Sequence, residues 1–122
     1  MTIGRVLITG GNGQLGSDLA ERLADRAQVA ALSHAELDIA DDDAVARAVE
    51  GCDVVFNCAA YHNVDLCETE EEMSFRINAV AVKRMAQACS AAGAKLVHFS
   101  TNYVFDGRRE EPYSEYDLPS PR

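Results

Sequence analysis

The sequence has no apolar run long enough to cross a bilayer, and no signal-peptide pattern follows Met1. Basic residues are scarce as well: 11 Lys and Arg stand against 20 Asp and Glu, so the formal net charge of the 122 residues is -9. That balance argues against nucleic acid and anionic membranes as partners. We therefore expect a soluble, cytoplasmic protein that binds neither.

The sequence also lacks any C-x-x-C pair. Its four cysteines are dispersed along the chain, at Cys52, Cys58, Cys67 and Cys89. Cys58 falls in an apolar run and Cys89 on a helical stripe, which indicates small buried side chains. The three histidines are equally scattered, so we expect no metal site. The length allows one domain with a core of its own.

The most informative segment is a glycine turn at residues 9–16, with the sequence T-G-G-N-G-Q-L-G. It follows the apolar run 6–8 and opens a helical pattern of leucines spaced four residues apart, which predicts strand, turn and helix. Gly10 permits a tight turn, Gly13 leaves room for phosphates, and Gly16 lets the helix pack closely on the strand. A pyrophosphate would then lie at the positive end of the helix. The G-x-x-G-x-x-G spacing, one residue longer than the usual fingerprint between the first two glycines, predicts nucleotide binding.

Strand and helix patterns alternate along the rest of the chain. Apolar runs typical of strands lie at residues 6–8, 28–32, 37–39, 54–56 and 96–99. Helical patterns lie at residues 15–27, 41–51 and 75–93. Asp41 is expected to cap the second helix, and Gly51 and Gly93 to end the second and third. The apolar stripe of the third helix comprises Phe75, Ala79, Val82, Ala86 and Cys89.

This order predicts an α/β protein, a Rossmann-type doubly wound parallel sheet of about five strands with helices on both faces. From Thr101 onward the sequence is polar and loop-like. The acidic run Glu68, Glu70, Glu71 and Glu72 is interpreted as a solvated helix start. Sheets of this kind bind ligands at the carboxyl ends of their strands. The predicted strand ends lie at residues 10–13, 33–34, 38–39, 57–60 and 100–103.

Several short motifs recur in the order typical of one family. They are Thr9-Gly10-x-x-Gly13-x-x-Gly16, Leu37-Asp38-Ile39, Asn57-Cys58-Ala59-Ala60-Tyr61, Val64-Asp65-x-x-Glu68, Asn78-Ala79, Ser100-Thr101-Asn102-Tyr103-Val104-Phe105-Asp106-Gly107 and Pro112-Tyr113-Ser114-Glu115. With these motifs, residues 6–121 resemble the extended short-chain dehydrogenase/reductase superfamily. Within it, the sequence is similar to the dTDP-4-dehydrorhamnose reductases and their sugar-nucleotide-reductase relatives. The segments at 64–68 and 100–107 are the most specific.

The resemblance implies a role for each matching position. Asp38 with Ile39 would hold the adenine, residues 57–60 would line the nicotinamide ribose, and Asn78 would fix the local backbone. Thr101 would be the catalytic hydroxyl that donates to the substrate carbonyl; without the motif, it would be interpreted as a strand-end hydroxyl bonded to local backbone. The predicted cofactor-binding residues are Gly10, Asn12, Gly13, Gln14, Leu15, Gly16, Ser33, Asp38, Ile39, Cys58, Ala59, Ala60, Tyr61 and Asn78.

The family's Tyr-x-x-x-Lys pair is missing from this sequence. In that pair the tyrosine supplies the proton, and the lysine lowers its pKa and holds the ribose. By the family pattern, the pair should follow Pro121, and the sugar-binding part is missing as well. We expect residues 1–122 to be the N-terminal part of an NAD(P)-binding domain, with a sheet incomplete on its C-terminal side and no activity alone. Asn102 departs from the aspartate common in relatives.

The cofactor choice depends on the end of the second strand, Leu32-Ser33-His34. An NAD site usually carries a carboxylate there for the ribose hydroxyls, and an arginine there suits a 2′-phosphate. Neither stands in this tripeptide, and Ser33 and His34 can donate to a phosphate. The sequence therefore favours NADP(H) weakly and leaves NAD(H) open.

The implied activity is that of an NAD(P)-dependent oxidoreductase. Hydride from the nicotinamide would reduce the 4-keto group of a dTDP-4-dehydro-6-deoxysugar, as in dTDP-rhamnose biosynthesis. Two alternatives remain: an epimerase or dehydratase of sugar nucleotides from the same superfamily, and a non-catalytic dinucleotide-binding regulatory protein. The Val64-Asp65-x-x-Glu68 and Tyr103-Val104-Phe105 segments favour the reductase. The partner expected is a nucleotide-sugar substrate, and whether the protein forms a homodimer is left open.

Overall fold

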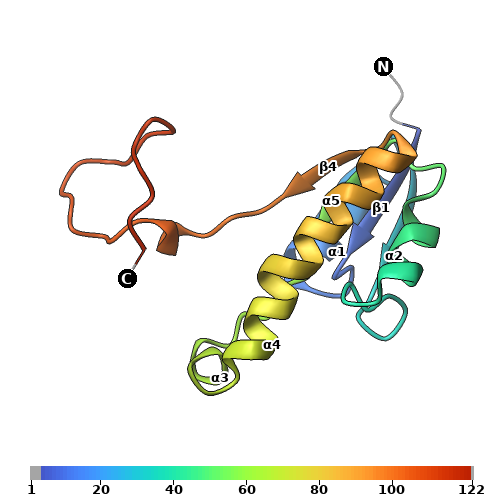
Figure 1. The fold of residues 1–122 in the computed structure, drawn as a ribbon. Coiled ribbons are helices and arrows are strands. Elements are labelled where there is room, and N and C mark those ends of the chain that lie inside the picture. Colours follow the sequence, from blue (N-terminus) through green and yellow to red (C-terminus); the bar gives the residue numbers. More distant parts are fainter. Residues whose placement is uncertain (1–3, 122) are drawn as a thin grey trace.

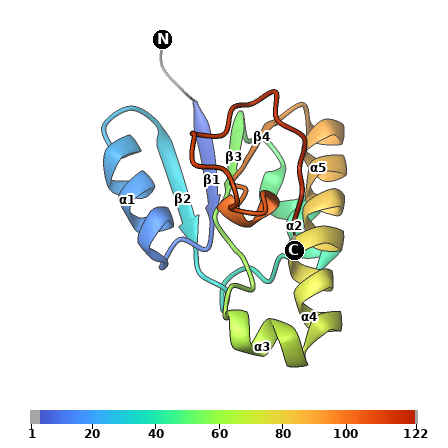
Figure 2. The same cartoon turned by 90° about the vertical axis from the view of Figure 1, so that its left-hand side faces the viewer.

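The computed structural model describes residues 4–121. These residues form a parallel sheet of four strands (Figure 1), in the order β2-β1-β3-β4 (Figure 2). The strands are β1 (Arg5–Thr9), β2 (Gln28–Leu32), β3 (Val54–Asn57) and β4 (Lys95–His98). Ile8 is in register with Ala31 of β2 on one side and with Phe56 of β3 on the other, so β1 is central. The predicted Rossmann-type α/β fold is confirmed.

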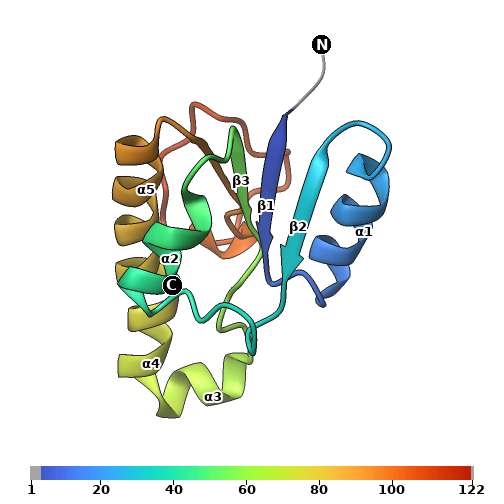
Figure 3. The same cartoon turned by 90° about the vertical axis from the view of Figure 1, so that its right-hand side faces the viewer.

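The helices cover both faces of this sheet. They are α1 (Gln14–Leu23), α2 (Asp42–Val49), α3 (Val64–Thr69), α4 (Glu71–Phe75), the π-helix η1 (Arg76–Val80), α5 (Ala81–Ala92) and the 3-10 helix η2 (Asn102–Val104). α1 lies on one side of the sheet, and α2 and α5 lie on the other (Figures 2 and 3). The chain crosses from β1 to β2 in one direction and from β3 to β4 in the other. Right-handed crossovers then place the connecting helices on opposite faces.

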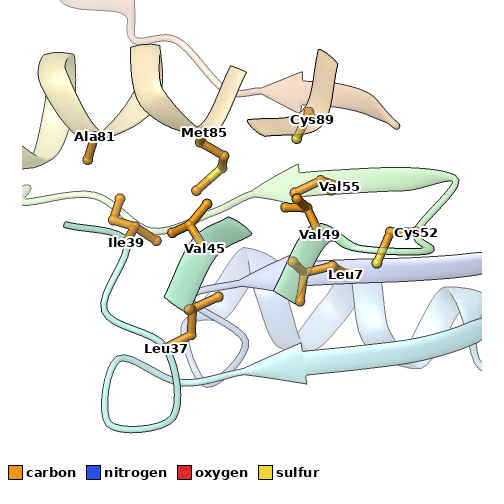
Figure 4. Close-up of a cluster of buried hydrophobic side chains, with 10 residues drawn as sticks. All are labelled: Leu7, Leu37, Ile39, Val45, Val49, Cys52, Val55, Ala81, Met85 and Cys89. Atoms are coloured by element: carbon orange, nitrogen blue, oxygen red, sulfur yellow. The ribbon is translucent and has the colours of Figure 1, made fainter. Parts of the chain in front are cut away.

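The main core lies between the sheet and the helix pair α2 and α5 (Figure 4). Its buried side chains are Leu7, Leu37, Ile39, Val45, Val49, Cys52, Val55, Ala81, Met85 and Cys89. Burying a side chain the size of Val, Leu or Met contributes about 1.5–3 kcal/mol. Cys89 belongs to this core, so its predicted burial is confirmed. Cys58 was also predicted to be buried, but it is only half-buried. The core holds β1 and β3 in place, and the candidate site is built from the ends of these two strands.

Residues 37–39, predicted as a strand, belong instead to the loop between β2 and α2. Leu37 and Ile39 are 5% and 3% exposed, so the apolar alternation arises because both side chains enter the core from a loop. The backbone turns here: the N–H of Leu37 donates to the Ser33 carbonyl at 2.9 Å, and Asp38 Oδ1 accepts from the N–H two residues on at 2.9 Å. Within residues 4–121 the sheet therefore has four strands rather than the predicted five.

The helical segment at residues 71–92 is interrupted by η1, and its buried face differs from the predicted stripe. Of the five predicted positions Cys89 alone is fully buried, and Phe75 is 67% exposed. The core side of α5 carries Ala81 and Met85 instead. Because a π-turn takes up an additional residue, positions before and after η1 do not share one face.

The predicted helix boundaries hold at three of four points. Asp41 Oδ1 accepts from the N–H of Ala44 at 3.0 Å and caps α2. Gly51 and Gly93 follow α2 and α5 in the left-handed region, with φ of 70° and 73°. α1, however, ends at Leu23 rather than at about residue 27.

Beyond β4, residues 99–121 extend away from the sheet as an arm (Figure 1). The arm is mostly irregular, as its polar sequence predicts. It packs on itself: the rings of Phe105 and Tyr113 stack with centroids 4.2 Å apart, and Arg109 pairs with Asp117 at 2.6 Å. The arm therefore has contacts of its own that do not depend on the sheet.

Candidate functional site

The glycine turn lies at the carboxyl end of β1, pressed between the two neighbouring strands. Gly10 has φ of 63°, the left-handed conformation that glycine adopts most readily. The N–H of Gly13 donates back to the Gly10 carbonyl at 3.0 Å, and the N–H of Gly11 donates to the Leu32 carbonyl of β2 at 2.8 Å. The turn is thus tied both to itself and to the end of β2.

Three glycines of the turn are required by close contact with other backbone. A Cβ at Gly10 would lie 2.9 Å from the backbone of Cys58, and one at Gly11 would lie 2.6 Å from the backbone of Ala31. A Cβ at Gly16 would collide with the carbonyl oxygen of Gly10. The sequence analysis predicted that Gly16 packs on the strand. In the structure, Gly16 packs on the glycine turn instead. Gly11 was not among the predicted site residues, because its neighbour belongs to another strand.

Gly13 differs from these three glycines. A Cβ there would meet a single atom within 4 Å, Gly10 O at the tight distance of 3.2 Å, so Gly13 is less enclosed by backbone than the other three glycines. Gly13 is the N-cap of α1, and no side chain among residues 4–121 caps this helix or places a carboxylate in its first turn. The first N–H groups of a helix have no intrahelical partner. The start of α1, with Asn12, Gln14 and Leu15 exposed around it, is therefore suited to an anion.

Three polar side chains connect the carboxyl ends of β1, β3 and β4. Thr9 Oγ1 donates to Asn57 Oδ1 at 2.6 Å, and Asn57 Nδ2 lies 3.2 Å from His98 Nδ1. Thr9 and Asn57 are 0% and 1% exposed. Because Asn57 Oδ1 is taken by Thr9, Nδ2 is the atom that faces His98, and His98 Nδ1 accepts from it. The two contacts that join Thr9, Asn57 and His98 link the ends of β1, β3 and β4. The sequence analysis did not predict them.

Asn78 positions the segment that follows β3. Its Oδ1 accepts from the N–H of Tyr61 at 2.9 Å, and its Nδ2 donates to the carbonyl of Tyr61 at 2.8 Å. The amide thus binds both backbone groups of one residue, in agreement with the predicted role in local backbone geometry. The Tyr61 hydroxyl donates to Glu70, and this bond raises the pKa of Tyr61 above its ordinary value. Glu70, interpreted as part of a solvated helix start, therefore has a specific partner.

The end of β2 also differs from the expectation. The backbone N–H and the hydroxyl of Ser33 both donate to Glu36 Oε2, each at 2.8 Å. These bonds, the backbone one first, hold the pKa of the Glu36 carboxyl below its ordinary value. The tripeptide 32–34 itself has no carboxylate, but Glu36 folds back onto Ser33 and brings one to this strand end. Its place 20 residues after Gly16 is a signal that could have identified it.

The remaining predicted residues lie in different settings. Ile39 is buried in the core, while the Asp38 side chain caps the following turn. Burial raises the pKa of the Cys58 thiol. Thr101 is exposed at the start of the arm, where its Oγ1 accepts from the N–H of Tyr103 at 3.2 Å. This bond to local backbone is the one expected of Thr101 when the family motif is left aside.

The structure therefore gathers the glycine turn, Ser33 and residues 57–61 at the carboxyl edge of the sheet, with Thr101 three residues beyond β4. A shallow pocket of about 650 Å³ lies elsewhere, on α3, α4 and η1, and borders Asn78. In the described part of the chain, no group of three His, Cys, Asp or Glu side chains could hold a metal ion. None of the helices in residues 4–121 has the length and apolar character needed to cross a membrane.

Comparison with known proteins agrees with this geometry. The chain is 44% identical over 119 residues to the dTDP-4-dehydrorhamnose reductase of Mycolicibacterium smegmatis, covering 96% of this chain and 36% of that protein. It is 41% identical over 123 residues to the reductase of the same name from Mycobacterium tuberculosis, covering 97% of this chain and 40% of that protein. The chain thus spans about two fifths of the length of these relatives.

A crystal structure of the dTDP-4-dehydrorhamnose reductase of Bacillus anthracis, in complex with NADP, is similar in fold. Its TM-score is 0.92 at 40% identity, covering 99% of this chain and 44% of that chain. The resemblance identified from the sequence motifs is therefore confirmed. Residues 4–122 match the family model described as the RmlD substrate binding domain, and the chain belongs to that family.

Proposed function

We propose that this chain binds NAD(H) or NADP(H) at the carboxyl edge of its sheet and forms the cofactor-binding part of an oxidoreductase. The proposed reaction is reduction of the 4-keto group of a dTDP-4-dehydro-6-deoxysugar, as in dTDP-rhamnose biosynthesis. The observation that carries the proposal is the start of α1. There, a glycine with one backbone atom within 4 Å of its Cβ position precedes a helix that no side chain among residues 4–121 caps.

The site residues then have distinct proposed roles. The N–H groups of residues 14–16 bind the pyrophosphate, since the first N–H groups of a helix have no partner within it. Asp38 accepts from the adenine amine, and Ile39 acts through its backbone because its side chain is in the core. Residues 57–60 line the nicotinamide ribose, and Asn78 positions the segment that follows them through its two bonds to Tyr61.

Thr101 is the proposed catalytic hydroxyl. Its Oγ1 accepts from the N–H of Tyr103, and its proton points at Asn102 Oδ1 across a long 3.4 Å contact. The proton can be redirected to a substrate carbonyl at little cost, while the bond from Tyr103 keeps the oxygen in place. The reduced nicotinamide, when bound, supplies the hydride. Thr101 then stabilises the negative charge that develops on the carbonyl oxygen.

We further propose that residues 1–122 are the N-terminal part of the NAD(P)-binding domain. The Tyr-x-x-x-Lys pair that supplies the proton, and the part that binds the sugar, would belong to further residues. Support comes from the sequence, which contains no such pair, and from the relatives, of which the chain spans about two fifths. General acid catalysis is worth roughly 10²–10⁴-fold, so the 122 residues alone should not turn over substrate at a useful rate.

The names of the relatives support the reaction class. A relative from Streptomyces antibioticus, 43% identical over 122 residues, is named a probable dTDP-4,6-dihydroxy-2-methyloxan-3-one 4-ketoreductase. Together with the reductases above, it favours ketone reduction on a dTDP-linked sugar over the epimerase and regulatory alternatives.

The test is a calorimetric titration of the chain with NADH and NADPH, using a pair of valine variants of α1. Gly13→Val places a branched side chain where the pyrophosphate would lie, so binding of both cofactors should be lost. Ala24→Val, at the exposed C-cap of the same helix, should leave both affinities unchanged. A folded Gly13→Val variant that binds as tightly as the original chain would refute the proposed site.

A further inference from the structure

We infer that Glu70 is a positioning residue for the nicotinamide side of the cofactor site, which it holds in place through the ring of Tyr61. The inference deepens the proposed function and rests on it. Glu70 belongs to the acidic run at residues 68–72. Of the four glutamates in this run, it alone accepts a hydrogen bond from another side chain within residues 4–121.

The first step is the set of atoms by which Tyr61 is held. Its N–H and its carbonyl bind the two ends of the Asn78 amide, at 2.9 and 2.8 Å. The same carbonyl accepts from the Cys67 thiol, whose sulfur lies 3.5 Å away. The Tyr61 hydroxyl donates to Oε2 of Glu70. Asn78 and Cys67 thus fix the backbone of Tyr61, and Glu70 is the residue that fixes its ring.

The second step is the place of Glu70 in the chain, at the break between α3 and α4. Its N–H donates to the carbonyl of Leu66 in α3 at 2.7 Å, and its own carbonyl accepts from the N–H of Ser74 in α4 at 3.0 Å. The main chain at residue 70 is therefore held by both helices, and the carboxylate extends from a fixed point. Because both bonds are made by backbone atoms, replacing the Glu70 side chain leaves them in place.

The third step is the segment that this contact connects to the helices. Residues 58–63, between β3 and α3, form no helix or strand. The shape of this segment therefore depends on side-chain contacts, and those of Tyr61 lie directly after residues 57–60, the proposed lining of the nicotinamide ribose. A lining that is ordered before the cofactor arrives loses less conformational entropy on binding. The contact from Tyr61 to Glu70 should accordingly strengthen binding of the nicotinamide half.

The protonation of Tyr61 also fits a positioning role rather than proton transfer. The hydrogen bond to Glu70 raises the pKa of Tyr61, and partial burial and the neighbouring negative charge raise it further. A tyrosine with a raised pKa gives up its proton less readily, so Tyr61 is a poor general acid. Its hydroxyl hydrogen is moreover already donated to Glu70. The contact therefore orients the ring, and the proton for the reaction has to come from another group.

The same bond could instead serve only to stabilise the fold around the α3–α4 break. A double-mutant cycle separates the two roles, because Glu70→Ala and Tyr61→Phe each remove one half of the bond. Glu70→Gln is the conservative variant, since its amide oxygen can still accept from the Tyr61 hydroxyl. Glu72→Ala is the matched control: it removes an exposed carboxylate of α4 that has no hydrogen bond or ion pair within residues 4–121.

The experiment measures by calorimetry the dissociation constants of NADH, NADPH and 5′-ADP, which lacks the nicotinamide half, for the full chain and each variant. Glu70→Ala and Tyr61→Phe should each weaken binding of the reduced cofactors by roughly 3–10-fold, and the double variant by no more than either single one. Affinity for 5′-ADP should stay within about two-fold. Glu70→Gln should recover most of the loss, and Glu72→Ala should bind all three nucleotides as the original chain does.

A spectroscopic measurement shows that the bond itself is lost. Alkaline titration of tyrosinate absorbance, taken as the difference between chains with Tyr61 and with Tyr61→Phe, isolates the ionisation of this one tyrosine among four. Without the Glu70 carboxylate, the ionisation of Tyr61 should move to lower pH, because the carboxylate raises its pKa in the original chain. Circular dichroism melts confirm that the variants are folded, and Tyr61→Phe, which removes one oxygen atom, tests the contact even where Glu70→Ala does not fold.

The outcomes are distinguishable. Cofactor affinities in folded Glu70→Ala and Tyr61→Phe equal to those of the original chain would overturn the role of Glu70 and leave the dinucleotide site intact. Additive losses in the double variant would overturn it as well, and so would an equal loss for 5′-ADP. Failure of the original chain to bind any of the three nucleotides would overturn the proposed function, and this inference with it.

Discussion

Replacing Thr9 by valine should destabilise this protein although valine has nearly the same shape. The Thr9 hydroxyl donates to Asn57 Oδ1 at 2.6 Å and accepts from the N–H of Ala59 at 3.4 Å. Both partners in the shorter bond are almost fully buried, so water cannot replace the missing hydroxyl. The valine variant would leave the oxygen of Asn57 without a donor in the interior.

The expected cost follows from these contacts. A buried hydrogen bond contributes about 1 kcal/mol net, and a stranded buried acceptor costs about 1–3 kcal/mol. The better burial of a second methyl group offsets part of this loss. We therefore expect a decrease of about 2–3 kcal/mol in the free energy of unfolding, or about 10 °C in melting temperature for a chain of this length.

The assay is urea unfolding followed by far-UV circular dichroism, because the sequence has no tryptophan to report by fluorescence. Thr9→Ser is the control: it keeps the hydroxyl and loses one methyl group, which costs about 0.5–1.5 kcal/mol. The hydrogen-bond argument predicts that Thr9→Ser is more stable than Thr9→Val. The opposite order would show that Thr9 acts through apolar packing, and would refute the argument.

Three further predictions concern the turn, the loop after β3 and pH. Gly16→Ala should lower the free energy of unfolding by about 1–3 kcal/mol, because the added Cβ collides with backbone. Gly13→Ala should change the free energy of unfolding by less than about 0.5 kcal/mol. Thermal melts of the two variants measure this difference in stability. Asn78→Ala should cost about 1–2 kcal/mol through its two bonds to Tyr61 and weaken NADH binding, and an affinity equal to that of the original chain would contradict the positioning role. The hydrogen bonds from Ser33 lower the pKa of Glu36 in the folded protein below 4.5. The ionised carboxylate therefore stabilises the folded protein above pH 4.5, and this stabilisation is lost as the pH falls through the lowered pKa. The stability difference between the original chain and Glu36→Gln should therefore shrink in urea titrations below pH 4.5.

The strands could be predicted from the sequence because a buried parallel strand has apolar side chains on both faces. Residues 54–56 show this in three consecutive apolar positions, and β3 includes all of them. Residues 37–39 mimic a strand because a loop that sends two side chains into the core has the same alternation. The buried face of α5 was misplaced because Ala81 and Met85 fit a helical spacing with Cys89 as well as Val82 and Ala86 do, so apolar spacing does not select between the two faces.

The site was predictable where its requirement is local. A positive φ at Gly10 and a helix start at Gly13 depend on neighbouring residues, and the glycine spacing shows both. The bond from Thr9 to Asn57 joins residues 48 positions apart, so no local pattern indicates it. Glu36 was missed for another reason: it lies four residues beyond the end of β2, and its carboxylate returns to Ser33 through a turn.

The contact of the glycine turn with backbone on both sides has a consequence for the entropy of binding. Gly10 lies against the main chain just after β3, and Gly11 lies against the main chain of β2. The turn cannot change its shape unless the sheet moves, so its donors are already ordered before any ligand arrives. An anion that binds there does not have to immobilise a loop, and little conformational entropy is lost. Amide hydrogen exchange of Gly11 and Gly13, whose N–H groups are hydrogen-bonded, should therefore be nearly as slow without ligand as the exchange of the strands beside the turn.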